Sequence, residues 1–187
     1  MSGHKHKILK SGDALRPSKR LGQHFLRDRS VVDKIIERSC FLKSDNILEI
    51  GPGLGALTIP LAGRVRHIIA VEKDVRLIET LNRQLSQAGI NNVTLINHDI
   101  LKLDWEKAFG AQQFKTRAIG NLPYNISSPF LKILFRYKDL IKDAVLMFQH
   151  EFAERLLAAA GGKDYGALTV LTRYNAEVSP LMRVSRE

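Results

Sequence analysis

A chain of 187 residues with 44% hydrophobic side chains is long enough for one domain with a full core, and it excludes a second large domain. Its 29 basic and 19 acidic side chains give a net charge of +10, which favours a polyanionic partner such as nucleic acid. A single cysteine, Cys40, excludes an internal disulfide and a multi-cysteine zinc site. No apolar run approaches the roughly 18 residues that a membrane span requires.

Positive charge is concentrated at the start of the chain. Residues 1–29 hold eight Lys or Arg against Asp13 and Asp28, so a net +6 of the +10 lies there. Residues 1–19 show no apolar periodicity, and we expect a flexible basic tail followed by one folded domain over residues 20–187. No secretory apolar segment is present near the start, and we expect a cytoplasmic protein; an organelle transit peptide is the alternative.

Strand and helix patterns alternate along the rest of the chain. The first predicted helix covers residues 28–39, with Asp28 or Ser30 as its cap. Predicted strands follow at 46–50, 67–71, 93–97, 116–120 and 143–149, and predicted helices at 56–63, 74–88, 129–138 and 150–160. For residues 167–185 the sequence allows either a further helix or final strands. The alternation predicts a doubly wound α/β domain with a mostly parallel sheet covered on both faces.

The first predicted strand leads into a glycine-rich turn. Gly51, Gly53 and Gly55 stand at alternate positions and are followed by helix formers, which predicts a strand, a tight turn and a helix start. Glycines suit such a turn because a side chain would hold a ligand away from the backbone, and because positive φ is often required. The segment therefore predicts a ligand site.

Two ligand classes use a turn of this kind. The spacing from Gly51 to Ala56, with Glu72 about 20 residues further on, matches the dinucleotide fingerprint. S-adenosylmethionine also requires an acidic residue for its ribose, and Glu49, just before the first glycine, suits its cationic sulfonium better than a pyrophosphate. The glycines alone leave both classes open.

The remaining strand ends distinguish these classes. In an open parallel sheet, ligands bind beyond the carboxyl ends of the strands, and Glu72, Asp99 and Asn121 each stand at such an end. A dehydrogenase would also need an acid or base to handle a hydride. His98 is the nearest histidine, and a loop histidine of this kind is usually only solvated.

The segment from Asn121 to Tyr124 favours a methyltransferase. The Asn121 side-chain oxygen and the following Leu122 carbonyl, exposed because Pro123 fixes the chain after it, form two acceptors that fit an exocyclic NH2 group. Holding both hydrogens aims the nitrogen lone pair at a methyl donor, while Tyr124 offers a face on which a base can stack. The alternative is a purely structural turn.

Five short motifs in this order resemble one family. They are Gln23-His24-Phe25-Leu26, Glu49-Ile50-Gly51-Pro52-Gly53-Leu54-Gly55, His98-Asp99-Ile100-Leu101, Asn121-Leu122-Pro123-Tyr124-Asn125-Ile126-Ser127-Ser128-Pro129, and Phe148-Gln149-x-Glu151-x-x-x-Arg155. Together they resemble the KsgA-type small-subunit rRNA adenine dimethyltransferases, close kin of the Erm methyltransferases that act on large-subunit rRNA. The likeness covers about residue 19 to the end.

The resemblance implies a Rossmann-like class I S-adenosylmethionine-dependent methyltransferase. Its reaction would transfer methyl groups to N6 of two adjacent adenosines near the 3′ end of small-subunit rRNA, during ribosome biogenesis. Its partner would be that rRNA within the immature subunit, and we expect a monomer with no metal and no membrane association. Two alternatives stay open: an Erm-like enzyme for large-subunit rRNA, and a non-catalytic RNA-binding assembly or transcription factor on the same fold.

The resemblance also implies roles for individual residues. The cofactor would be bound by Gln23, His24, Leu26, Gly51, Gly53, Gly55, Glu72, Lys73, Asp99, Ile100 and Asn121. Within that set, Glu72 would hold the ribose hydroxyls and Asp99 would accept from the adenine amino group. The target base would be held by Asn121, Leu122, Pro123 and Tyr124. His24 stands where relatives often have Asn. Because relatives usually continue into a small helical domain, we expect residues 20–187 to form a catalytic domain without that C-terminal part.

Overall fold

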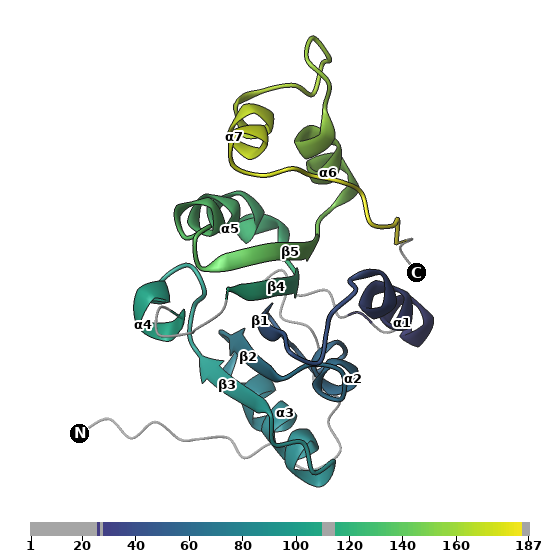
Figure 1. Ribbon diagram of the computed structural model, residues 1–187, viewed down its shortest axis with the longest axis vertical. Coiled ribbons are helices and arrows are strands. Elements are labelled where there is room, and N and C mark those ends of the chain that lie inside the picture. The colour runs from purple at the N-terminus through teal and green to yellow at the C-terminus, as the bar shows by residue number, and fades with distance from the viewer. Residues whose placement is uncertain (1–25, 27, 110–114, 185–187) are drawn as a thin grey trace, which may run out of the picture.

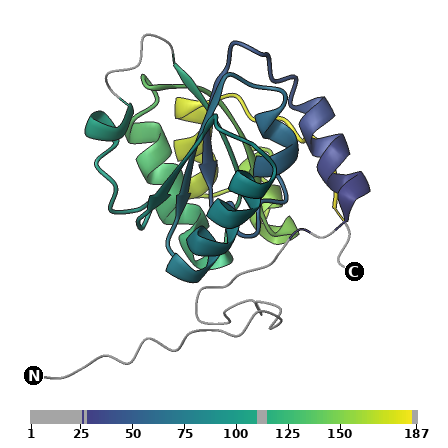
Figure 2. The same ribbon diagram turned by 90° about the horizontal axis from the view of Figure 1, so that it is seen from below.

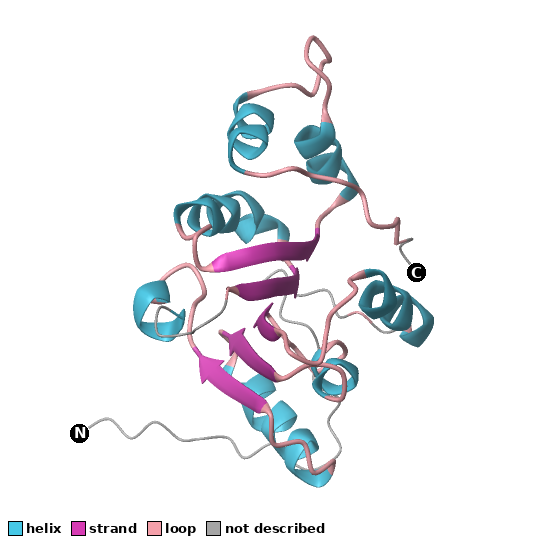
Figure 3. Cartoon of the chain, in the orientation of Figure 1, coloured by secondary structure: helices cyan, strands magenta, loops and turns pink. Residues whose placement is uncertain are grey.

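Five strands form one parallel sheet at the centre of the molecule (Figures 1 and 3). The computed structural model describes residues 26, 28–109 and 115–184. The strands are β1 (Asn46–Ile50), β2 (His67–Glu72), β3 (Val93–Asn97), β4 (Thr116–Asn121) and β5 (Ile141–Met147). Their order is β3-β2-β1-β4-β5, and every neighbouring pair is parallel. The strand order reverses between β1 and β4, which is the position where ligands bind in doubly wound folds.

Helices cover both faces of this sheet (Figures 1 and 2). They are α1 (Arg29–Arg38), α2 (Thr58–Ala62), α3 (Val75–Gln87), α4 (Trp105–Phe109), α5 (Tyr124–Arg136), α6 (His150–Leu157) and α7 (Ala167–Asn175). Residues of α1 and α2 share a core cluster on one face, whereas α4, α5 and α6 contribute to the cluster on the other. The pair α6 and α7 lies beyond β5 at one edge of the sheet (Figure 1). No helix within the described ranges is long and apolar enough to cross a membrane.

The central strand β1 shows why the sheet is buried on both faces. Ile47 belongs to the cluster beneath α1 and α2, while Leu48 and Ile50 belong to the cluster beneath α4 and α5. All three side chains are at most 2% exposed. Successive side chains of a strand point to opposite faces, so this near-continuous apolar run serves two cores at once.

Short polar side chains set the starts of α1 and α3. Asp28 accepts hydrogen bonds from the backbone N–H groups of Ser30 at 2.8 Å and Val31 at 3.4 Å, so it is the cap of α1. Asp74 caps α3 by accepting from the Arg76 N–H at 3.1 Å. Both satisfy donors that a helix start leaves without intrahelical partners.

One predicted helix has the wrong start, and one helix was not predicted. The helix expected from residue 129 begins five residues earlier, at Tyr124, and Pro129 lies inside it. The apolar stripe of α5 already begins at Ile126, so packing outweighs the single backbone hydrogen bond that Pro129 removes. The helix α4 was not predicted because its five residues are too few to display a helical period.

The carboxyl half differs from expectation at the last strand and at the helix expected over residues 150–160, which ends at Leu157, and the structure also decides the segment that the sequence left open. The last strand covers Ile141–Met147 rather than residues 143–149, because the chain leaves the sheet before Phe148, which packs against Phe152 of α6 with ring centroids 4.9 Å apart. The open segment after residue 166 forms the helix α7, and its described remainder, residues 176–184, contains no strand.

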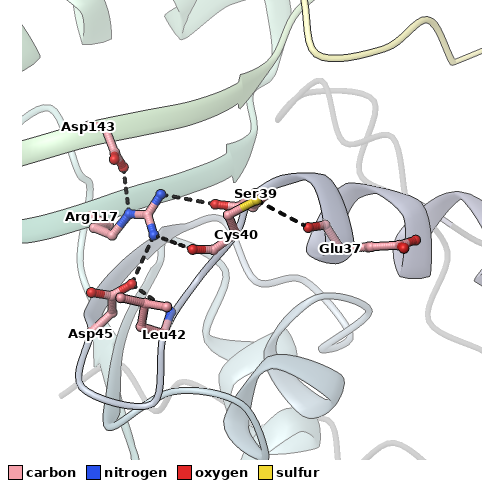
Figure 4. Close-up of polar contacts among 7 residues, drawn as sticks. All are labelled: Glu37, Ser39, Cys40, Leu42, Asp45, Arg117 and Asp143. Carbon is pink, nitrogen blue, oxygen red and sulfur yellow. Dashed lines mark hydrogen bonds and ion pairs between the residues drawn. The ribbon is translucent and has the colours of Figure 1, made fainter.

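Arg117 joins three segments at the amino end of β4, opposite the strand ends that carry the predicted site (Figure 4). Its Nε donates to Asp143 of β5 at 2.8 Å, and its Nη1 donates to Asp45 and to the Cys40 carbonyl, each at 2.9 Å. Its Nη2 donates to the Ser39 carbonyl at 2.9 Å. A buried guanidinium needs such a set of acceptors, and here they connect β4 with β5 and with the α1–β1 connection.

Candidate active site

The four predicted strand ends meet along one edge of the sheet. Gly51 follows β1, Glu72 ends β2, Asp99 lies two residues after β3, and Asn121 ends β4. Because these strands are parallel neighbours, the order along the edge is Asp99, Glu72, Gly51, Asn121. The segments that the sequence separates by up to 70 positions therefore form one continuous row.

The glycine turn after β1 has the backbone conformation that its sequence predicts. Gly51, Gly53 and Gly55 all have positive φ, at 67°, 59° and 82°. A Cβ added at Gly51 would have no heavy atom within 4 Å, so the space beside this residue is open. Gly51 therefore exposes backbone rather than a side chain to a ligand, whereas Gly55 is buried, and a Cβ there would lie 2.5 Å from Leu81 Cδ1.

Glu72 connects the end of β2 to this turn. Its Oε2 accepts from the Gly53 N–H at 3.3 Å and its Oε1 accepts from the Asp74 N–H at 2.9 Å. Only 7% of Glu72 is exposed, and this burial raises the pKa of its carboxyl despite the backbone donors that oppose the rise. A buried carboxylate held in one orientation is suited to accept hydroxyl hydrogens from a ligand.

A second buried carboxylate, Glu49, lies on β1 directly before the turn. It is 1% exposed, and its Oε2 has no hydrogen-bond partner among the described residues. Burial raises the pKa of Glu49 from 4.5 to about 7, the negative charge of Glu72 adds to the rise, and the hydroxyl and amide of Thr58 oppose it. The carboxyl is therefore close to half protonated near neutral pH.

Lys73 and Asp99 connect the ends of β2 and β3. The Lys73 ammonium donates to Asp99 Oδ2 at 2.8 Å, and the Leu101 N–H donates to Oδ1 at 3.0 Å. Partial burial raises the pKa of Asp99, but these donors outweigh it and hold the pKa below its ordinary value. The neighbouring Ile100 is 5% exposed and belongs to the core cluster that includes α4 and α5, so its packing holds this loop against the core.

The end of β4 turns directly into α5. The Leu122 N–H donates to the Met147 carbonyl at 3.3 Å, which holds the segment to β5, and Leu122 is 5% exposed. The Pro123 carbonyl accepts from the Ser127 hydroxyl at 3.2 Å, inside the first turn of α5. Tyr124, in contrast, is 64% exposed, so its ring is available to a partner.

Gly120 sets how closely β4 approaches β1. It pairs with Ile50, and a Cβ added at Gly120 would lie 2.9 Å from the Ile50 carbonyl oxygen. Real Cβ atoms do not come this close to backbone oxygens, so any larger residue would push the strands apart. The glycine turn after Ile50 and the segment that begins at Asn121 thus leave the sheet side by side.

The described residues place most of the predicted site together. Gln23 and His24 lie outside the described ranges, and their roles stay predictions. Leu26 packs against the cluster beneath α1 and α2. The sequence did not identify Asp74, whose backbone N–H donates to the Glu72 carboxylate. Its position just before an apolar helical pattern could have indicated a helix cap at this place.

Other kinds of site are not evident in the described ranges. No group of three or more His, Cys, Asp or Glu is arranged there to hold a metal ion. A cleft of about 380 Å³ lies among α6, α7 and the segment that follows, lined by Leu156, Leu157, Arg173, Ala176, Glu177 and Val178. Its lining contains no residue of the strand ends, so it is separate from the site above.

Two solved structures share this architecture. A dimethyladenosine transferase from Plasmodium falciparum is 37% identical, with a TM-score of 0.70 over 79% of this chain and 51% of that one. The 23S rRNA methyltransferase ErmE is 30% identical, with a TM-score of 0.62 over 80% of this chain and 55% of that one. The fold is the Rossmann-like fold of class I S-adenosylmethionine-dependent methyltransferases, as the sequence predicted.

Sequence relatives give the same family. Ribosomal RNA small subunit methyltransferase A of Desulforapulum autotrophicum is 47% identical over 93% of this chain and 61% of its own length. A probable ribosomal RNA small subunit methyltransferase A of Pyrococcus abyssi is 39% identical over 96% of this chain and 62% of its own length. The chain thus spans less than two thirds of these relatives. The family model described as ribosomal RNA adenine dimethylase matches residues 15–187. The chain belongs to the ribosomal RNA adenine dimethylase family.

Proposed function

We propose that this chain is the catalytic part of an enzyme that transfers methyl groups from S-adenosylmethionine to N6 of two adjacent adenosines near the 3′ end of small-subunit rRNA. One observation carries the proposal. The glycine turn and the Asn121–Tyr124 segment issue from neighbouring strands, next to the paired residues Ile50 and Gly120. Neighbouring strands are about 4.8 Å apart, so a donor on one turn and an acceptor on the other can meet.

The residues at the strand ends fit the cofactor. Open space beside Gly51 leaves room against the turn, and two buried carboxylates, Glu49 and Glu72, flank it. Glu72 is suited to accept hydrogen bonds from the ribose hydroxyls. Asp99, at one end of the row of strand ends, is suited to accept a hydrogen bond from the adenine amino group. When bound, S-adenosylmethionine supplies a methyl group already activated by the sulfonium.

The acceptor amine would be held by the β4 end. The Asn121 side-chain oxygen and the Leu122 carbonyl each accept one N6 hydrogen, which removes the nitrogen lone pair from conjugation with the ring and aims it along the transfer direction. Positive charge that develops on N6 is stabilised by these same oxygens, and no strong base is needed. The proton leaves to solvent after transfer.

The target adenine must leave its stack to reach this segment. Extruding a base costs a few kcal/mol, least when it is already unpaired, so a loop adenosine is the easier substrate. The exposed ring of Tyr124 offers a stacking surface for the extruded base. The net charge of +10 favours an rRNA partner, and we further propose a monomeric, cytoplasmic protein.

An Erm-like activity on large-subunit rRNA is the second candidate, favoured by the structural likeness to ErmE. The test is transfer of labelled methyl groups to immature small subunits and, in parallel, to unmethylated large-subunit rRNA, followed by mapping of the modified nucleotides. Two adjacent dimethylated adenosines near the 3′ end of small-subunit rRNA support the proposal. Label confined to large-subunit rRNA supports the second candidate, and cofactor binding without label in either indicates a non-catalytic RNA-binding protein.

A further inference from the structure

Glu49 is the most buried ionisable group near the site, and the proposed reaction gives it no task. Its Oε2 lacks a hydrogen-bond partner among the described residues. The Thr58 hydroxyl is near enough to influence the Glu49 carboxyl, but its Oγ1 also lacks a partner in hydrogen-bond geometry. Buried polar atoms are nearly always satisfied in folded proteins. An unsatisfied carboxylate oxygen directly before a ligand-binding turn indicates that its partner arrives with the ligand.

Among the described residues, no cation neutralises Glu49. Its strand neighbours in the sheet are Ala70 of β2 and Ile119 of β4, and α2 contains no ionisable side chain. The charged group that acts on it is Glu72, whose charge repels a second negative charge. Arg117 lies two positions before Ile119 on β4, but its guanidinium is bound by Asp45 and Asp143.

From α1, the groups packed against this face are the apolar side chains Val32, Ile35 and Ile36. Glu72 has its own partners in the Gly53 and Asp74 amides. Among the described residues, Glu49 therefore faces one anion, the two polar groups of Thr58 and otherwise apolar side chains. In such surroundings the neutral acid is the favoured form until a positive charge arrives.

We propose that Glu49 holds a proton in a large share of the cofactor-free molecules at pH 7 and below, and that it releases this proton to solvent when the positively charged methionine part of the cofactor binds. The released proton leaves a carboxylate that balances the incoming charge. This inference rests on the proposed use of S-adenosylmethionine. It makes Glu49 a positioning and affinity residue, since it would act on the cofactor and not on the target base.

The pKa of Glu49 supports a coupling that is measurable near neutral pH. With a value of about 7 in the empty site, Glu49 is about half protonated at pH 7 and mostly protonated at pH 6. If binding requires the carboxylate, cofactor affinity rises about tenfold between pH 6 and pH 8 because the proton no longer has to be displaced. A Glu49→Gln variant, which keeps the shape of the neutral acid, would lose this dependence.

The test is isothermal titration of S-adenosylmethionine into wild-type protein and Glu49→Gln in two buffers of very different ionisation enthalpy. The difference in apparent enthalpy between buffers gives the number of protons released. We expect wild type to release about half a proton more than Glu49→Gln at pH 7, and nearly one more at pH 6. Because both proteins bind the same cofactor, proton exchange by the cofactor's own amino group cancels in this comparison.

A second measurement uses wild-type protein alone. Difference infrared spectroscopy at pH 6 should show the C=O stretch of a buried protonated carboxyl, and addition of S-adenosylmethionine should remove it. Equal proton counts in the two proteins, or an unchanged carboxyl band, would overturn the inference while leaving cofactor binding intact. Absence of any binding heat and of any thermal shift with S-adenosylmethionine would instead overturn the proposed function.

Discussion

The backbone N–H of Gly53 donates to the Glu72 carboxylate across 3.3 Å, so the turn that follows β1 is tied to the last residue of β2. One acidic side chain thereby has two tasks. It fixes the conformation of the turn in the empty protein, and in the proposed complex it would also accept from the ribose. Loss of Glu72 should therefore affect both the shape of the site and its direct contact with the cofactor.

Glu72→Ala should weaken S-adenosylmethionine binding by about 1–3 kcal/mol, the range for removing one partner of a buried polar contact. Calorimetric titration measures the change. The matched control is Glu79→Ala, which removes an exposed carboxylate from α3 and should leave affinity unchanged. Equal affinity of Glu72→Ala and wild type, at equal folded fraction, would remove Glu72 from the cofactor site.

Asn121→Ala should lower the rate of methyl transfer by about 10²–10³-fold, as expected for losing one well-placed contact in a closed site. Cofactor affinity should stay within a few-fold, because the proposed cofactor contacts come mainly from the other strand ends. Single-turnover transfer to immature small subunits, with cofactor binding measured in parallel, separates the two effects. Asn91→Ala, in the exposed loop before β3, is the control. A folded Asn121→Ala protein with the parent rate would remove the main chemical support for adenine methylation.

Glu49 should make the stability of the cofactor-free protein depend on pH. Its pKa is raised from 4.5 to about 7 in the folded state, so below pH 4.5 both states hold the proton and the folded protein has its full stability. As pH rises from 4.5 to 7, the unfolded chain loses the proton first, and folded wild type loses stability on the order of 3 kcal/mol. Glu49→Gln does not titrate and should avoid this loss. Urea unfolding of both proteins across this range measures it, and parallel pH profiles would contradict it.

Arg117→Met should reduce the free energy of unfolding by about 3 kcal/mol, because it leaves the partly buried Asp45 carboxylate with the Leu42 N–H and no cation, and removes the Arg117 donors from two carbonyls. Arg38→Met is the control. Arg38 is exposed and donates one hydrogen bond to the Leu181 carbonyl, and its loss should cost less than about 1 kcal/mol. Similar denaturant midpoints for the two variants would show that the Arg117 contacts in Figure 4 add little to stability.

Local pattern was enough to predict most of the fold. The bounds of β1 and β3 match the predicted runs, because each is an apolar segment between turn residues. The start of α5 was missed because Pro129 is ordinarily a first-turn residue, and only packing of the longer apolar stripe places it inside the helix. Local pattern is weakest where tertiary contacts decide the boundary.

The candidate site was predictable in outline and not in its contacts. Parallel strands bring Gly51, Glu72, Asp99 and Asn121 to one edge of the sheet, and the parallel direction follows from the alternation of strands and helices. The lack of a partner at the Glu49 Oε2 was not predictable, since it depends on which side chains of other elements surround the carboxylate. Hydrogen-bond satisfaction is a property of the folded neighbourhood and has no local signal.

The close pairing of Gly120 with Ile50 would fix the distance between the two groups that react in the proposed reaction. The glycine turn and the Asn121–Tyr124 segment leave two paired strands, and Gly120 is the residue that permits the close approach of β4 to Ile50. In the proposed reaction, the distance between methyl donor and amine would then be set by the backbone rather than by closure of a loop. A side chain at position 120 would lengthen that distance while leaving every group of the proposed chemistry in place.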